Sequence, residues 1–183
     1  GDAISGTSSW GGAVRFGGVQ WATNFSTQPG FTSFPLPGMS GEAALPSTVD
    51  LYVNNALRMS RKVPSGPFSI EDLPVTTGHG DARLVVRDIL GREQVITQPF
   101  YATRRLLQQG LQDYSYELGF VRRNFGTDSN NYGRALAIGT HRLGITEQFT
   151  AEFHGGLLGH QQTLGLGGVL MLPAAGVLSG SFA

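Results

Sequence analysis

Four histidines are the residues of this chain best suited to metal binding or acid–base chemistry. They are His79, His141, His154 and His160, and their spacing matches no zinc motif such as H-E-x-x-H. The chain has no cysteine, which excludes disulfides, thiolate ligands and cysteine nucleophiles. His79 stands between two glycines, a composition typical of a turn. We expect His154 on the polar face of a strand and His160 at the start of the next strand, so no metal site is predicted.

The sequence also contains no complete catalytic motif. Glu71 and Asp72 are adjacent carboxylates, but neighbouring strand residues point to opposite faces and cannot share an acid–base site. The sequence holds no G-x-S-x-G nucleophile elbow. The run Leu164–Gly168 lacks the full G-x-G-x-x-G, and no helical pattern follows it, so a dinucleotide site is not predicted. We therefore expect no enzyme and no cofactor.

The composition of the chain excludes further classes of function. Glycine accounts for 27 of the 183 residues and charged residues for only 14%, against a usual share of about 25% for charged residues. The formal net charge is zero, which disfavours a nucleic-acid partner. An uncharged stretch runs from 155 to 183, but its glycines and Pro173 disfavour a transmembrane helix. The first residues lack the pattern of a signal peptide, so we expect either a protein without one or an internal piece.

Alternation of polar and apolar residues predicts strands, most clearly after residue 110. Such strands separate two sets of side chains onto opposite faces. The row Tyr114–Phe120 would span about 20 Å, close to the ~25 Å apolar band of an outer-membrane barrel. We predict lipid contact for one set: Tyr114, Tyr116, Leu118, Phe120, Phe149 and Phe153. We predict a lumen-facing position for the other: Ser115, Glu117, Thr150 and Glu152.

A soluble β-sandwich would show the same alternation, with one face on a core and one in water. Two features favour the barrel. The polar face is small and rich in glycine, and the connections alternate in length, with a short turn at Gly144–Glu147 and a longer loop at Asn124–Asn131. Short periplasmic turns and longer extracellular loops are typical of such barrels. This asymmetry predicts that the turn is periplasmic and that an epitope at Ser129 would be extracellular.

The middle of the chain has a different pattern. Prolines and glycines between Gln28 and Pro46 predict a linker, and Gln98-Pro99 suggests a second hinge. Between them, turn residues separate short strands and charged residues are denser; the strands are expected at 48–53, 57–63, 68–70, 82–88 and 94–97. We predict barrel strands and a linker in 1–45, a small β-sandwich in 46–99, and barrel strands in 100–183. Residues 101–109 fit a helical turn or an extended return equally well.

Three segments of the middle region resemble the plug of fimbrial outer-membrane usher proteins. They are Val49–Asn55, Val63–Pro74 and Leu84–Gln94, and the run G-P-F-x-I-x-D-L is the most specific. The flanks around Gly18–Gln20 and Tyr114–Gly126 resemble the barrel strands on either side, so the similarity covers essentially the whole chain. The plug motif comprises Val63, Pro64, Gly66, Pro67, Phe68, Ile70, Asp72, Leu73, Asp88, Gly91 and Arg92.

The resemblance implies an all-β fold, namely part of a transmembrane antiparallel β-barrel with an inserted β-sandwich plug. It implies a pore of the chaperone–usher pathway, which assembles and secretes pilus subunits and is gated by the plug. The implied partners are pilus subunits, periplasmic chaperone–subunit complexes, outer-membrane lipid and the rest of the usher chain, in the bacterial outer membrane. Six or seven strands cannot enclose a sandwich, because barrels of about eight strands are filled by side chains. The alternative is a soluble β-rich adhesin or binding module.

Overall fold

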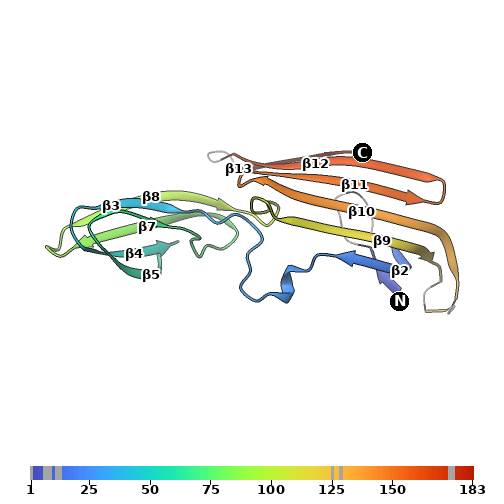
Figure 1. Cartoon of the computed structure of the whole chain (residues 1–183), viewed down its shortest axis with the longest axis horizontal. Helices are drawn as coiled ribbons and strands as arrows, with labels where there is room; N and C mark the ends of the chain where they lie inside the picture. The colour runs from blue at the N-terminus through green and yellow to red at the C-terminus, as the bar shows by residue number, and fades with distance from the viewer. Residues whose placement is uncertain (1, 6–9, 11–13, 125, 128–129, 173–175) are drawn as a thin grey trace. The chain divides into compact units, whose positions relative to one another are not determined.

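The computed structural model describes residues 2–5, 10, 14–124, 126–127, 130–172 and 176–183 (Figure 1). The chain divides into two compact units. The first contains Gly1–Ser33, Arg105–Leu172 and Val177–Ala183, and the second contains Phe34–Arg104. Across the described ranges the regular structure is strands plus one 3-10 turn, η1 (Phe25–Thr27).

The first unit is a seven-stranded antiparallel sheet (Figure 1). Its strand order is β1-β2-β9-β10-β11-β12-β13, so β9 to β13 follow the chain as a meander. The second unit is inserted between β2 and β9, which are nevertheless hydrogen-bonded neighbours, with Val19 opposite Leu118. The strands are β1 (Asp2–Ile4), β2 (Arg15–Ala22), β9 (Gln112–Arg122), β10 (Tyr132–Thr146), β11 (Phe149–Leu158), β12 (Gln161–Leu172) and β13 (Gly176–Phe182).

The turn between β10 and β11 is tighter than the sequence predicts. The pattern placed a turn at Gly144–Glu147, but β10 continues to Thr146 with a register shift after Gly144. The strand continues because Gly144 pairs with a neighbouring segment: its N–H donates to Leu111 O, and its carbonyl accepts from Gly110 N. The turn itself is therefore only two residues long, Glu147 and Gln148.

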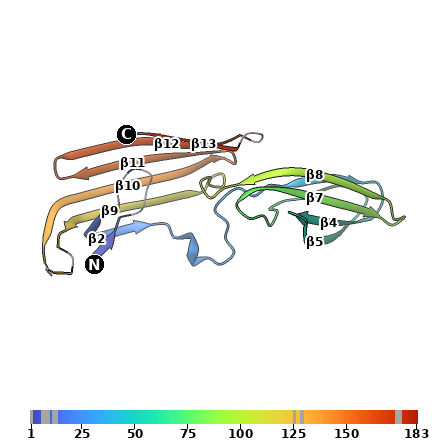
Figure 2. The same ribbon diagram turned by 180° about the vertical axis from the view of Figure 1, so that it is seen from behind.

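The second unit is a small sandwich of two sheets, seen from the other side in Figure 2. A four-stranded sheet has the order β5-β4-β7-β8, and a two-stranded sheet pairs β3 with β6. The strands are β3 (Met39–Ala43), β4 (Ser47–Val53), β5 (Ala56–Val63), β6 (Gly66–Ile70), β7 (Gly78–Asp88) and β8 (Glu93–Ala102). Alternation along β4 sends Val49, Leu51 and Val53 into the core, where they meet Leu84 and Leu73.

Three local predictions are wrong. The predicted linker 28–46 contains β3, whose Met39 and Ala43 belong to the core. His79 does not lie in a turn: it is inside β7, opposite Tyr101. The suggested hinge at Gln98-Pro99 lies inside β8, where Pro99 is tolerated because β8 is an edge strand. In each case the ladder of a paired strand overrides the local preference of glycine or proline for turns.

Candidate functional site

The seven-stranded sheet has one face covered with exposed apolar side chains. Cross-strand pairs put Val19 beside Leu118 and Phe153 beside Leu166, so the apolar sets of adjacent strands coincide. Leu118 is 65% exposed and Leu164 82%. The exposed apolar residues of β2, β9, β11 and β12 include Val19, Trp21, Tyr116, Leu118, Phe120, Phe149, Phe153, Leu157, Leu164, Leu166, Leu170 and Leu172. A water-soluble domain rarely exposes so large a contiguous apolar surface.

Aromatic side chains gather at one end of this apolar face, where β2 ends and β9 begins. The Tyr114 and Tyr116 rings stack 5.5 Å apart, and the Trp21 ring meets that of Tyr114 edge-on at 5.7 Å. His141 on β10 joins them, with its Nδ1 atom 2.7 Å from the Tyr116 hydroxyl. At the other end, the Arg122 guanidinium lies over the Tyr132 ring at 4.9 Å. Polar aromatic groups at both ends of an apolar band are typical of membrane-spanning strands.

The opposite face of the sheet carries the polar set. Glu117 is only 2% exposed, and its Oε1 accepts hydrogen bonds from Gln20 Nε2 and Ser115 Oγ, both at 3.0 Å. Glu152 and His154 lie on the same face of β11, and Thr140 Oγ1 is 3.1 Å from His154 Nδ1. The carboxylates therefore sit within hydrogen-bonded networks. The assignment of Ser115, Glu117, Thr150 and Glu152 to a lumen stays a prediction, because a lumen needs a closed barrel.

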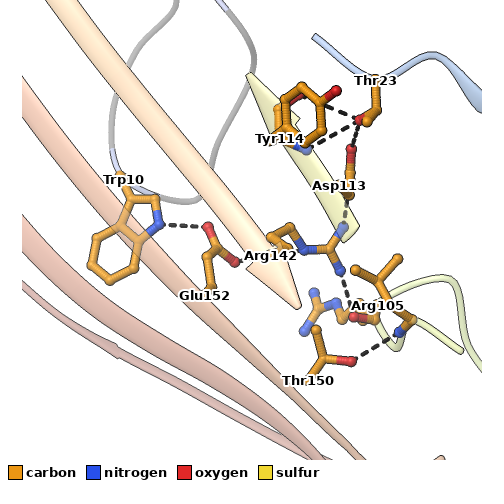
Figure 3. A network of polar contacts seen from close by, with 9 residues as sticks. Trp10, Thr23, Arg105, Asp113, Tyr114, Arg142, Thr150 and Glu152 are labelled. Carbon is orange, nitrogen blue, oxygen red and sulfur yellow. Dashed lines mark hydrogen bonds and ion pairs between the residues drawn. The ribbon is translucent and has the colours of Figure 1, made fainter. Parts of the chain in front are cut away.

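Arg142 is the centre of a polar network that is drawn in Figure 3. Its Nη1 pairs with Asp113 Oδ2 at 3.1 Å, its Nη2 donates to the Arg105 carbonyl at 2.5 Å, and its Nε lies 3.9 Å from Glu152 Oε2. Thr23 Oγ1 donates to Asp113 Oδ1. Thr23 comes directly after β2, in the segment that leads to the second unit. Arg105 is the first residue of the segment that leads from the second unit back to β9. Within the first unit, the network therefore joins the segment that follows β2 to the segment that precedes β9.

The segment 105–111 is docked on the polar face by backbone contacts. Of the region 101–109, Tyr101 and Ala102 extend β8, and the rest is neither helix nor strand. Leu106 and Leu107 are each 1% exposed. Leu107 N donates to the buried Thr150 Oγ1 at 2.8 Å. A Cβ on Gly144 would lie 2.1 Å from the Gln108 carbonyl oxygen, so only glycine permits this close approach. We call this segment the return latch.

Trp10 forms a second contact across the polar face, from the connection between β1 and β2. Its indole N–H donates to Glu152 Oε1 at 2.5 Å (Figure 3). Its ring also stacks on that of His154 at a centroid distance of 5.5 Å. Cβ atoms on Gly165 and Gly167 would lie 2.6 and 3.0 Å from the Trp10 ring. The two glycines of β12 therefore leave the space that the indole occupies.

The plug-motif residues lie in the second unit, where they shape the sandwich. Val63, Ile70 and Leu73 are core residues, and Phe68 packs against that core. Pro64 and Pro67 lie at the β5–β6 connection and at the start of β6. Gly66, Asp72 and Gly91 have positive φ angles of 121°, 53° and 81°, which explains the glycines and the short polar residue. The motif is therefore a folding signature.

Asp88 organises the turn between β7 and β8. Its Oδ1 accepts from Leu90 N and Arg92 N, both at 2.9 Å, and its Oδ2 pairs with Arg92 Nε at 2.7 Å. Burial by itself would raise the pKa of the Asp88 carboxyl, but the hydrogen bonds from Arg92 and Leu90 outweigh that effect and lower the pKa. The ionised carboxylate thus accepts the hydrogen bonds of two backbone N–H groups in the turn.

Sequence reasoning missed Trp10, Thr23, Asp113 and Arg142 as members of a shared network. The alternation did place Asp113 on the same face as Glu117, but no local signal connects it with Thr23. Among the described residues, no cluster of histidines and acids could hold a metal ion. No helix in the described part of the chain is long and apolar enough to cross a membrane.

Comparison with known proteins identifies relatives of both units. The family model "Outer membrane usher protein" matches residues 5–181. The F1 capsule-anchoring protein of Yersinia pestis is 26% identical over 162 residues, which cover 86% of this chain and 19% of that protein. The usher FaeD of Escherichia coli is 36% identical over 102 residues, 56% of this chain and 12% of that protein. The chain thus spans about a fifth or less of the length of these relatives.

A solved structure supports the fold. The likeness is to a chain of the E. coli P pilus tip assembly intermediate PapC-PapD-PapK-PapG, with a TM-score of 0.60 and 22% identity. It covers 99% of this chain and 22% of that chain. The predicted fold class, an all-β part of an usher barrel with an inserted sandwich, is therefore confirmed, as is the predicted location in the bacterial outer membrane. The match over residues 5–181 shows that this chain belongs to the outer membrane usher family.

Proposed function

We propose that this chain forms part of the wall and the plug of an outer-membrane pore that assembles and secretes pilus subunits. The observation that carries the proposal is a single sheet with an exposed apolar face and a polar face, interrupted between two adjacent strands by a separate sandwich. The apolar face suits lipid and the polar face suits a water-filled lumen. The proposed partners are pilus subunits delivered as complexes with periplasmic chaperones, and the proposed role is transport and assembly without enzymatic activity.

The wall needs further strands to close. In the described sheet β1 and β13 have a neighbour on one side only, and an open edge in lipid leaves backbone groups unpaired. We propose that other strands of an usher polypeptide complete the barrel. A soluble adhesin is not favoured, because Leu118, Leu164 and Leu166 would be exposed to water on it.

The second unit is proposed as the gate. Residues 46–99 form most of it, and β3 and the end of β8 complete the compact unit Phe34–Arg104. It has its own core around Leu51, Leu73 and Leu84, so it can keep its fold while it moves. A movable plug needs two states only a few kcal/mol apart for a delivered subunit to shift their populations.

Deletion of the second unit tests the gate. Ser33 and Arg105 are suitable ends, because the Ser33 carbonyl already accepts a hydrogen bond from Gln108 N at 2.9 Å. A Gly/Ser linker of about six residues can bridge ends this close, since each residue reaches about 3.3 Å. In the full usher polypeptide, the deletion should leave a folded barrel, raise planar-bilayer conductance and make cells sensitive to bulky antibiotics.

The matched control deletes only Ser47–Gln98, which removes the centre of the core but leaves β3 without its partner β6. We expect this variant also to show raised conductance. Protease should cleave its remaining plug residues faster than it cleaves the intact second unit of the wild type. An inserted barrel whose conductance is unchanged after removal of Phe34–Arg104 would contradict the gating role.

A further inference from the structure

The second unit exposes its large apolar side chains on one of its two sheets. Residues 34–104 are all described, and their exposed large apolar residues are Leu57, Ile89, Leu90, Val95 and Tyr101. All of them belong to the four-stranded sheet or to its β7–β8 turn, and β3 and β6 contribute none. Leu57 pairs with Tyr52 and Val95 pairs with Val85, at positions that alternate with the core residues of β4 and β7. These side chains therefore share the side of the sheet that points away from the core, which we call the outer face.

Arg83 lies at the centre of the outer face. It is the direct neighbour of Tyr52 across the β4–β7 ladder, and its guanidinium lies over the Tyr52 ring, 5.0 Å from the centroid. Its Nε is buried without a hydrogen-bond partner, and none of the carboxylates in the described part of the chain forms an ion pair with it. A buried donor without a partner is rare in native proteins and calls for an explanation.

The neighbouring charges of the outer face already have partners. Arg87 pairs with Glu93 at 2.6 Å, and the Asp50 carboxylate accepts a hydrogen bond from Ser60 Oγ at 2.5 Å. Arg83 is thus an arginine fork that is held on an aromatic ring, with apolar side chains on the strands to both sides. Such a fork is preorganised to bind a carboxylate in two-point geometry. Arginine and tyrosine are also the residues that most often carry the binding energy of an interface.

We propose that the outer face binds a pilus subunit, through a subunit carboxylate that pairs with Arg83 and apolar side chains that pack on Leu57 and Val95. The inference rests on the proposed function, in which a delivered subunit displaces the second unit. A ligand shifts an equilibrium only by its difference in affinity for the two states. A subunit that opens the gate must therefore bind the displaced state more tightly, and a binding face on the gate itself provides that difference.

Two arginines of the second unit provide a matched pair of variants. Arg61 on β5 is exposed and pairs with Val49, whose side chain enters the core, so Arg61 lies on the opposite side of the sheet from Arg83. Arg83→Glu and Arg61→Glu change the net charge of the unit equally. Only Arg83→Glu places a repulsive charge at the proposed carboxylate contact.

Site-specific photo-crosslinking in the full usher polypeptide measures the contact. p-Benzoylphenylalanine replaces either Leu57, on the outer face, or Ser69, which is exposed on the two-stranded sheet. The cells also produce the chaperone and the pilus subunit of the same assembly system. We expect a cross-link to the subunit from position 57 and not from position 69. Arg83→Glu should lower its yield about tenfold or more, whereas Arg61→Glu should leave it unchanged.

A charge swap tests the carboxylate. Mass spectrometry of the cross-linked peptide locates the contact on the subunit, and replacing its nearest acidic residue with lysine should restore the yield in Arg83→Glu. Equal yields from positions 57 and 69, or an equal loss in the two glutamate variants, would overturn the proposal. So would a cross-link from position 57 that joins only another segment of the usher polypeptide.

A second variant covers the case in which Arg83→Glu does not fold, which protease sensitivity of the second unit reveals. Val95 is 54% exposed, so Val95→Asp adds a negative charge to the outer face without disturbing the core. It should also lower the yield at position 57, and an unchanged yield would count against the proposal. The deletion of Phe34–Arg104 keeps the two claims separate. Raised conductance in the deletion, with no subunit cross-link at position 57, refutes only the binding face, whereas unchanged conductance refutes the gate.

Discussion

Thr150→Val should loosen the return latch without disturbing the sheet. Thr150 is 1% exposed, and its hydroxyl accepts the hydrogen bond from Leu107 N at 2.8 Å. Valine has the same shape but no acceptor, so the buried Leu107 N–H loses its partner. An unsatisfied buried donor costs about 1–3 kcal/mol, and each 1.4 kcal/mol is a factor of ten. The opening equilibrium of the latch should therefore rise roughly 5- to 150-fold.

Hydrogen–deuterium exchange of the full usher polypeptide measures this opening, because protection of a segment reports its local unfolding free energy. Peptides covering 103–111 should exchange faster by that factor in Thr150→Val. The matched control is Thr140→Val, which removes the contact with His154 Nδ1 but does not touch the latch. Unchanged exchange at 103–111, or an equal increase in Thr140→Val, would refute the role assigned to this hydrogen bond.

Four further predictions follow from named contacts. This chain contributes no cysteine. In a full usher polypeptide whose other cysteines are replaced, a hydrophilic thiol reagent should modify Ser115→Cys and Glu152→Cys but spare Leu118→Cys, and labelling of position 118 alone would reverse the assigned faces. Thr150→Cys should stay protected even in the Phe34–Arg104 deletion, because the return latch that covers it remains. Leu84→Ala, at a fully buried position of the second unit, should destabilise that unit by about 2–5 kcal/mol, seen as faster proteolysis there, whereas exposed Leu57→Ala should have little effect. Asp88→Asn should lower the melting temperature of the second unit near pH 7. Since the folded-state pKa of Asp88 is lowered, the difference in melting temperature from wild type should shrink as the pH falls below the ordinary aspartate pKa near 4. A difference that does not depend on pH would contradict the role of the charge.

Membrane topology remains open to a direct measurement. The two-residue turn Glu147–Gln148 and the longer β9–β10 connection keep the asymmetry that predicts a periplasmic turn and an extracellular loop. Ser129, the predicted epitope position, lies outside the described residues. An epitope there should be detected on intact cells, and detection only after permeabilisation of the outer membrane would invert the orientation.

Local patterns in the sequence were enough to identify strands and their faces. Side chains in a strand alternate with a period of two, so Tyr116, Leu118 and Phe120 had to share a face whatever their neighbours were. The plug motif was recognisable because positive φ at Gly66 and Gly91 and burial of Ile70 and Leu73 demand particular residue types. The turn predicted around His79 was wrong, and the turn predicted at Gly144–Glu147 is shorter and begins later, because the paired ladders extend the strands through glycines.

The tertiary structure alone decided which of these faces touch each other. Strand order placed β2 beside β9 across the whole insertion, which brought Thr23 to Asp113 and Arg105 to Arg142. Gly144 looked like a turn residue, yet its role is to admit the backbone of Gln108. Gly165 and Gly167 looked like a featureless polar face, yet they accommodate the ring of Trp10. Alternation is a property of each strand, whereas these contacts depend on long-range pairing that no local pattern encodes.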